Sequence, residues 1–115
     1  KPTVADARFA KPLDTNLIDY LLETHEFLVT IEEGSIGGFA SHVLNYINNI
    51  RKKRTTTIIK NIFFQDQFID HMDPDDQYKE VQMDIYSIID KITSLFDNKV
   101  IDIKNFNAKK VDNIV

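Results

Sequence analysis

Two adjacent carboxylates, Glu32 and Glu33, stand where a catalytic acid and base could lie. They follow the apolar run at residues 27–31, and α/β proteins often place acid and base groups at the end of a buried strand. Neighbouring residues of a strand point to opposite faces, however, so at most one of the two can face a given cleft. The pattern therefore favours a structural or interface role for this pair.

The glycine-containing turn at residues 34–38 lies between a predicted strand and a predicted helix. Backbone N–H groups at such a position often bind phosphate. The spacing matches neither G-x-G-x-x-G nor a P-loop with its lysine, and the two preceding carboxylates would repel an anion. We expect this turn to be a bend in the fold.

Acidic residues and a histidine gather further along the chain and suggest a metal site. They are Asp70, His71, Asp73, Asp75 and Asp76. The spacing lacks the glycine and the glutamate that an EF-hand loop needs at its sixth and twelfth positions. Acidic residues are also favoured at the start of a helix by its dipole. We therefore expect helix capping here and no metal ligand.

The other polar groups form no catalytic pattern. His25, His42 and His71 have no nearby serine that suggests a triad, and the chain has no cysteine. The basic run at residues 51–54 follows a predicted helix, where cations suit the helix dipole. We expect structural roles for the histidines and a solvated loop for the basic run.

The elements that would position these residues follow from the alternation of short apolar runs with helical periodicity. This alternation is typical of βαβ units and a parallel sheet. Strands are predicted at residues 3–9, 27–31 and 55–64. Helices are predicted after the N-caps Asp14, Asp73 and Asp84, and after Gly38 with Phe39, Val43, Leu44, Ile47 and Ile50 facing inward. The fold class is α/β, a three-layer α/β/α domain with three or more mostly parallel strands.

Composition limits the class of protein. A chain of 115 residues with 43% hydrophobic and 28% charged residues is typical of one globular domain. A net charge of -4 argues against a nucleic-acid partner, and no apolar run approaches the roughly 20 residues of a membrane span. We assign residues 1–97 to the domain and residues 98–115 to a weakly ordered tail, in which residues 100–103 are a candidate extra strand.

Four sequence blocks in a fixed order carry a resemblance to a known family. They are DARFAKPLD at residues 6–14, VTIEEG at 29–34, GGF at 37–39 and DQFIDH at 66–71. Together they resemble the C-terminal domain of 1-deoxy-D-xylulose-5-phosphate synthase, a thiamine-diphosphate enzyme of the transketolase superfamily. The resemblance runs from about Val4 to about Phe96. It implies a fragment of a longer chain that lacks the family domain's first strand and helix, with the glycine turn as a structural bend.

The resemblance also implies what the parent enzyme does. It would condense pyruvate with glyceraldehyde 3-phosphate and release carbon dioxide, with thiamine diphosphate and Mg²⁺ held by two earlier domains and none bound here. This domain would have no catalytic residue and would pack against the rest of its chain and a second copy, with Phe68, Ile69 and Glu33 as interface candidates. For Phe68 and Ile69, core packing is an equal alternative.

Location and two other functions remain open at this stage. The parent is expected in the bacterial cytoplasm or a plastid-like organelle. The chain could instead be a stand-alone interaction module, or the C-terminal domain of another thiamine-diphosphate enzyme such as transketolase or the pyruvate dehydrogenase beta subunit. The joint DARF-x-KPLD and DQFI-x-H blocks favour the synthase over those enzymes.

Overall fold

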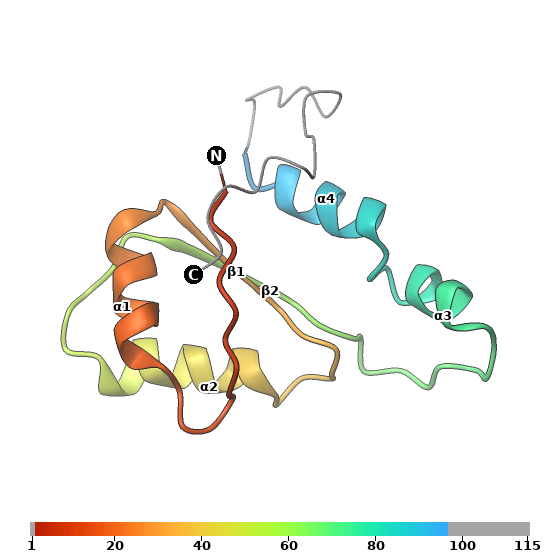
Figure 1. Cartoon of the computed structure of the whole chain (residues 1–115), viewed down its shortest axis with the longest axis horizontal. Coiled ribbons are helices and arrows are strands. Elements are labelled where there is room, and N and C mark those ends of the chain that lie inside the picture. The colour runs from red at the N-terminus through yellow and green to blue at the C-terminus, as the bar shows by residue number, and fades with distance from the viewer. Residues whose placement is uncertain (1, 97–115) are drawn as a thin grey trace.

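The computed structural model describes residues 2–96, which form a small parallel sheet with helices around it (Figure 1). In chain order the elements are α1 (Thr15–Thr24), β1 (Phe27–Ile31), α2 (Phe39–Asn45), the π-helical turn η1 (Tyr46–Ile50), β2 (Ile58–Ile62), α3 (Pro74–Glu80) and α4 (Ile85–Thr93). The predicted assignment to the α/β class is confirmed.

The sheet pairs β1 with β2 in parallel, with Phe27 opposite Ile58 and Ile31 opposite Ile62. Paired residues of parallel strands share a face, and one such pair is linked by a hydrogen bond. Thr30 is buried, and its Oγ1 donates to Asn61 Oδ1 at 2.7 Å, which satisfies this polar group. The cross-strand link therefore fixes the register on the face that lies toward α1 and α2.

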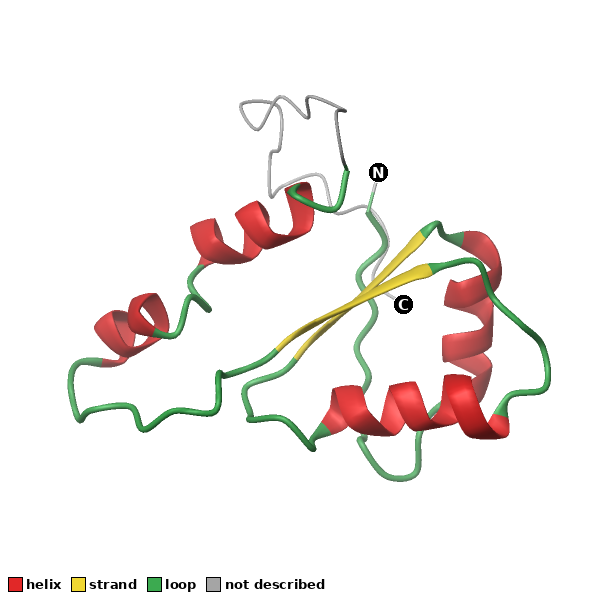
Figure 2. Cartoon of the chain, turned by 180° about the vertical axis from the view of Figure 1, so that it is seen from behind, coloured by secondary structure: helices red, strands yellow, loops and turns green. Residues whose placement is uncertain are grey.

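Alternate strand residues serve two separate hydrophobic clusters. The first consists of buried residues from α1 and from α2 with its π turn, packed against Leu28 and Ile59 of the sheet; its buried members are Ile18, Leu22, Val43 and Tyr46. Val29 packs against the second cluster, whose buried members are Ile62, Val81 and Met83. Since successive strand residues point to opposite faces, the clusters lie on opposite sides of the sheet. Figure 2 shows helices on both sides of the strand pair.

The second cluster brings α3 and α4 to the sheet. Tyr78 of α3 and Ile88 and Ile92 of α4 are half-buried against it. Phe27 on the same sheet face has its ring centroid 4.5 Å from that of Phe96, just beyond α4. The layers are thus α1 and α2, then the sheet, then α3 and α4, as the three-layer prediction requires.

Two strand predictions need correction. Residues 3–9 form no strand: Val4 makes an isolated bridge, and the chain leaves the extended conformation at Arg8, where φ is +56°. The Asp6 side chain accepts a hydrogen bond from Arg8 N at 2.9 Å and stabilises this bend. The part of the chain that the structure describes therefore has two strands where we expected three or more, and the strand expected at 55–64 is the shorter β2.

The helix starts agree closely with the sequence. Asp14 Oδ1 accepts from Leu17 N, Asp73 Oδ1 from Asp75 N, and Asp84 Oδ1 from Tyr86 N and Ser87 N, so all three predicted N-caps are confirmed. The helix after Gly38 differs at its end, where η1 widens the turn. Ile50 is 61% exposed there, so its predicted inward orientation is wrong.

The predicted tail at 98–115, its candidate strand at 100–103 and the domain limit at residue 97 lie outside the described residues. Among the helices of residues 2–96, none has the length and apolar character that crossing a membrane requires.

Candidate functional site

Glu32 is part of the turn between β1 and α2 and caps the helix. Its Oε2 accepts a hydrogen bond from Phe39 N at 2.6 Å, and its Oε1 accepts one from Ala40 N at 2.9 Å. Both amides are among the first N–H groups of α2, which have no partner within the helix. The carboxylate therefore completes the helix start, which is a structural role.

Glycines make this close approach feasible. A Cβ on Gly38 would lie 2.2 Å from Glu32 Oε2 and 3.1 Å from its Cδ. Gly37 has φ +104°, a conformation that L side chains rarely adopt. The turn is thus shaped around the Glu32 carboxylate, and the prediction that it is a bend agrees with this geometry.

The contacts of Glu32 also determine whether this turn could bind a diphosphate group. The amides that would face an anion already donate to Glu32, and its negative charge would repel a phosphate group. No group of three or more acidic or histidine side chains suited to a metal ion occurs within the described part of the chain. The start of α2 therefore does not fit a diphosphate group.

Glu33 points to a different partner from Glu32. The Tyr78 hydroxyl of α3 donates to Glu33 Oε1 at 3.0 Å, and this hydrogen bond raises the pKa of Tyr78. Glu33 is exposed, so the bond lies at the surface. The two glutamates of the candidate acid/base pair thus have different partners: Glu32 accepts hydrogen bonds from α2 and Glu33 accepts one from α3.

The interface candidates after β2 differ in their surroundings. Phe68 is fully exposed in the loop between β2 and α3. Ile69 is half-buried and packs against the second hydrophobic cluster. Core packing therefore describes Ile69, whereas Phe68 presents an aromatic ring to solvent. The assignment of Phe68 and Ile69 to an interface stays a prediction.

The three histidines have different surroundings. The two ring nitrogens of His25 lie 2.8 Å from Thr3 Oγ1 and from Thr24 Oγ1, which ties the N-terminal segment to the end of α1. His42 is exposed on α2 and lines a pocket with Lys11. His71 is exposed beside the capping Asp73. The structure brings none of them together with Glu32 or Glu33 into a catalytic arrangement.

Sequence reasoning missed a polar cluster around Asp19. The Tyr46 hydroxyl donates to Asp19 Oδ2 at 2.9 Å, and Arg51 Nε donates to Asp19 Oδ1 at 2.5 Å. Lys53 Nζ lies 2.7 Å from Glu23 Oε1, one turn further along α1. The Arg51 side chain is only 4% exposed, so the prediction that residues 51–54 form a solvated loop is wrong for Arg51.

These contacts shift two ionisation equilibria. The hydrogen bond from Arg51 lowers the pKa of Asp19, and the bond from Tyr46 acts in the same direction. Burial raises the pKa of Tyr46, and the Asp19 carboxylate adds to this effect. The one sequence signal was the apolar stripe of α1, since Asp19 and Glu23 lie four residues apart beside it. The cluster joins α1 to the chain that follows η1.

Comparison with known proteins gives the context for this arrangement. The transketolase C-terminal domain model matches residues 1–88. The probable 1-deoxy-D-xylulose-5-phosphate synthase 2, chloroplastic, of Oryza sativa subsp. japonica is 47% identical over 93 residues, which are 81% of this chain and 13% of that protein. The 1-deoxy-D-xylulose-5-phosphate synthase of Rhodobacter capsulatus is 45% identical over 76 residues, 66% of this chain and 12% of that protein.

This chain thus spans about an eighth of the length of these two relatives. The family match covers the N-terminal segment, the glycine turn, both strands and the first turn of α4. The resemblance inferred from the four sequence blocks is therefore confirmed. The family model matches most of this chain, whose parallel strand pair lies between helical layers. The chain therefore belongs to the transketolase C-terminal domain family and is a member of the kind found in 1-deoxy-D-xylulose-5-phosphate synthases.

Proposed function

We propose that this chain is the C-terminal domain of a 1-deoxy-D-xylulose-5-phosphate synthase. The parent would condense pyruvate with glyceraldehyde 3-phosphate, with loss of carbon dioxide, in isoprenoid precursor biosynthesis. The observation that carries the proposal is 47% identity over 93 residues to a protein of that name. A chloroplastic and a bacterial relative support a plastid-like organelle or a bacterial cytoplasm as its location.

The domain's own part in the enzyme would be structural. Glu32 caps α2, His25 ties down the N-terminal segment, and Asp19 pairs with Arg51. These polar side chains are thus engaged in holding the fold. Thiamine diphosphate and Mg²⁺, which supply the electron sink for decarboxylation, would be held by the rest of the parent chain. The domain would brace the dimer in which that chemistry occurs.

Phe68 and Glu33 supply a contact surface for this bracing role. Exposed aromatic residues are enriched at the centres of protein interfaces, and Phe68 is fully exposed. Glu33 lies in the loop after β1, and Phe68 lies in the loop after β2. Because the strands are parallel, both loops leave the same edge of the sheet. We expect this edge to face the remainder of the parent enzyme or its second copy.

A domain exchange tests the proposed function. The matching C-terminal segment of the Rhodobacter capsulatus synthase would be replaced by this chain, and formation of 1-deoxy-D-xylulose 5-phosphate would be assayed with purified protein. We expect a folded, active dimer. A chimera with native-like circular dichroism but no activity above that of the truncated synthase would contradict the proposal.

The interface is tested separately in the same chimera. Phe68→Asp should weaken the dimer by about tenfold or more in dissociation constant, as loss of an interface anchor does. Phe9→Asp changes another exposed aromatic residue, 66% exposed in the N-terminal segment, and serves as the control. Analytical ultracentrifugation measures both. Equal dimer stability in the two variants would show that Phe68 is not an interface residue.

A further inference from the structure

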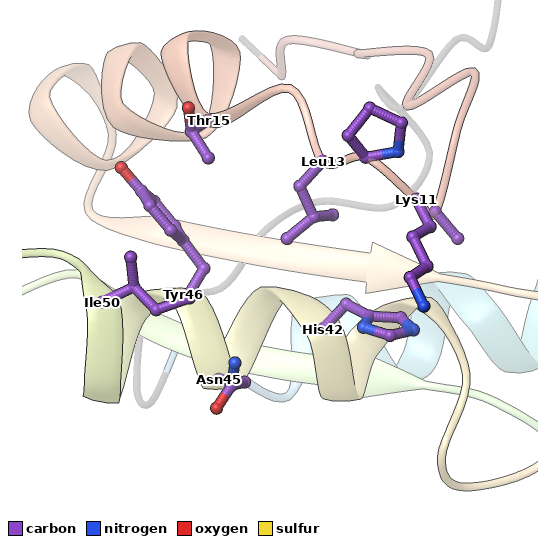
Figure 3. A pocket seen from close by; sticks show the side chains of 9 residues that line it. Lys11, Leu13, Thr15, His42, Asn45, Tyr46 and Ile50 are labelled. Carbon is purple, nitrogen blue, oxygen red and sulfur yellow. The ribbon is translucent and has the colours of Figure 1, made fainter.

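A pocket of about 290 Å³ lies between the N-terminal segment and the helix formed by α2 and η1 (Figure 3). Its lining residues are Ala10, Lys11, Pro12, Leu13, Thr15, His42, Asn45, Tyr46 and Ile50. No acidic residue of the described chain contributes to this lining. Glu32, Glu33 and Asp19, whose structural contacts are described above, do not line this pocket, and their contacts give it no function.

The pocket has two chemically different parts. At one end the Lys11 side chain extends toward the ring of His42, and both residues are exposed (Figure 3). At the other end Tyr46 and Ile50 lie across from Leu13, which gives apolar walls (Figure 3). Nitrogen donors therefore gather at one end of a mostly apolar pocket.

Asn45 adds a further donor. Its Oδ1 accepts a hydrogen bond from Asn49 Nδ2 at 2.9 Å, and its NH₂ group carries two N–H donors. Lys11 carries three N–H donors and no acceptor, and a neutral histidine carries one N–H donor. The polar groups of this pocket can thus supply several donors to one bound group.

The walls are held in place before any ligand arrives. Tyr46 is 8% exposed and belongs to the first hydrophobic cluster, and its hydroxyl is fixed by Asp19. Leu13 packs against the same cluster. A pocket whose walls are already ordered binds with a smaller loss of side-chain freedom.

We propose that this pocket binds a short-chain carboxylate. The carboxylate group would accept hydrogen bonds from Lys11 and His42, and the alkyl chain would lie against Leu13 and Tyr46. Charge complementarity selects an anion, since the lining has a lysine and no acid. The apolar walls select an organic anion over an inorganic one. The volume is at the lower end of small-molecule sites, roughly 300–1,000 Å³, so the ligand must be short.

Titration of the isotope-labelled chain with hexanoate, followed by ¹H–¹⁵N correlation spectra, tests the proposal. Saturable shifts are expected for the amides of residues 10–15 and 42–50. The dissociation constant should be about 1–10 mM, in line with the binding energy per atom of small ligands. Two further probes are 1-hexanol, which keeps the chain without the charge, and inorganic phosphate, which keeps a charge without the chain. Each should bind at least about fivefold more weakly than hexanoate.

Two lysine substitutions test whether Lys11 donates hydrogen bonds to the carboxylate. Lys11→Met keeps an unbranched apolar side chain and removes the charge, so it should weaken hexanoate binding about three- to fivefold. Lys52→Met is the matched control, because Lys52 is exposed and does not line the pocket, and it should leave binding unchanged. Spectra of both variants that otherwise overlay the parent spectrum show that the fold is intact.

Several outcomes would overturn the proposal. These are shifts that do not saturate by 50 mM hexanoate, equal binding of 1-hexanol or phosphate, or equal loss in both lysine variants. Shifts of the pocket amides that depend on protein concentration without ligand would assign the pocket to a second copy of the chain. None of these outcomes depends on the activity of the parent enzyme, so the pocket and the proposed function fail independently.

Discussion

Glu32 shows how a single residue can look catalytic in sequence and be structural in space. Its position after a strand favours acid/base chemistry, and only the fold reveals that its partners are amides seven and eight residues later in the same chain. Sequence reasoning identified the residue and the bend, and it preferred the structural role because Glu33 must point elsewhere. It could not supply the partner, because the distance across a turn depends on dihedral angles that the sequence does not state.

Substitution of Gly38 tests the fit of this turn. Gly38→Ala places a methyl group 2.2 Å from Glu32 Oε2, so the carboxylate must leave α2 or the turn must shift. We expect a loss of about 1–3 kcal/mol in the free energy of unfolding, measured by urea denaturation. Gly34→Ala is the control, because its Cβ would meet Glu32 at an ordinary 3.7 Å. Equal losses in the two variants would contradict a role for the carboxylate.

The Asp19 pair predicts a dependence of stability on pH. Because the pKa of Asp19 is lowered from its ordinary value of 3.8, its contribution is present above pH 3.8 and is lost as pH falls through the folded-state pKa. Asp19→Asn should cost about 1–2 kcal/mol at pH 7, since Asn keeps one acceptor without the charge. The difference between the two proteins should shrink below pH 3.5. A difference that stays constant from pH 7 to pH 2.5 would contradict this ion pair.

Arg51 marks the limit of sequence reasoning at the level of single residues. Four consecutive basic residues suggest a solvated loop, and Lys52, Lys53 and Arg54 are indeed exposed. Only the Arg51 side chain is covered, because the chain after η1 places it against Asp19, 32 residues earlier in the sequence. A partner at that separation is set by the packing of α1 on the following helix. No local pattern could distinguish Arg51 from its neighbours.

At the scale of elements, features that depend on adjacent residues were predicted correctly, whereas features that depend on distant residues were not. Helix starts at Asp14, Asp73 and Asp84 were predictable because a cap depends on two or three adjacent residues. The strand at residues 3–9 was wrong because a strand needs a neighbour, and Arg8 instead takes a left-handed conformation. The π-helical end of α2 also escaped prediction: the regular apolar period places Ile50 inward, whereas the wider i→i+5 turn leaves it exposed.

The cap of α1 offers a test at this scale. Asp14→Ala removes the acceptor for Leu17 N and should lower the free energy of unfolding by about 1 kcal/mol. Asn16→Ala, two residues later, changes an exposed residue of the first turn and should stay within about 0.5 kcal/mol of the parent. Thermal denaturation followed by circular dichroism measures both. A smaller loss for Asp14→Ala than for Asn16→Ala would refute the capping assignment.

At the scale of the whole molecule, the described chain has two hydrophobic clusters divided by one thin sheet. The first cluster joins α1, α2 and η1, whereas the second depends on Ile62, Val81 and Met83. Within the described residues, neither α3 nor α4 contains a buried side chain. The three layers were predictable from the alternation of elements. Their unequal burial was not, because it depends on how much of each helix reaches the sheet.

This inequality predicts that the two sides open separately. Regions with few buried contacts unfold locally at lower free energy than the rest of a domain. Val43 and Val81 are each 1% exposed, one in each cluster, so the same substitution can test both sides. Val→Ala at either site should cost about 1–3 kcal/mol. Val81→Ala should speed amide hydrogen exchange in α3 and α4 while β1 and α1 change little, whereas Val43→Ala should speed exchange throughout. If both variants accelerate the same set of amides equally, the domain opens as one cooperative unit, and the second cluster is as firmly joined to the sheet as the first.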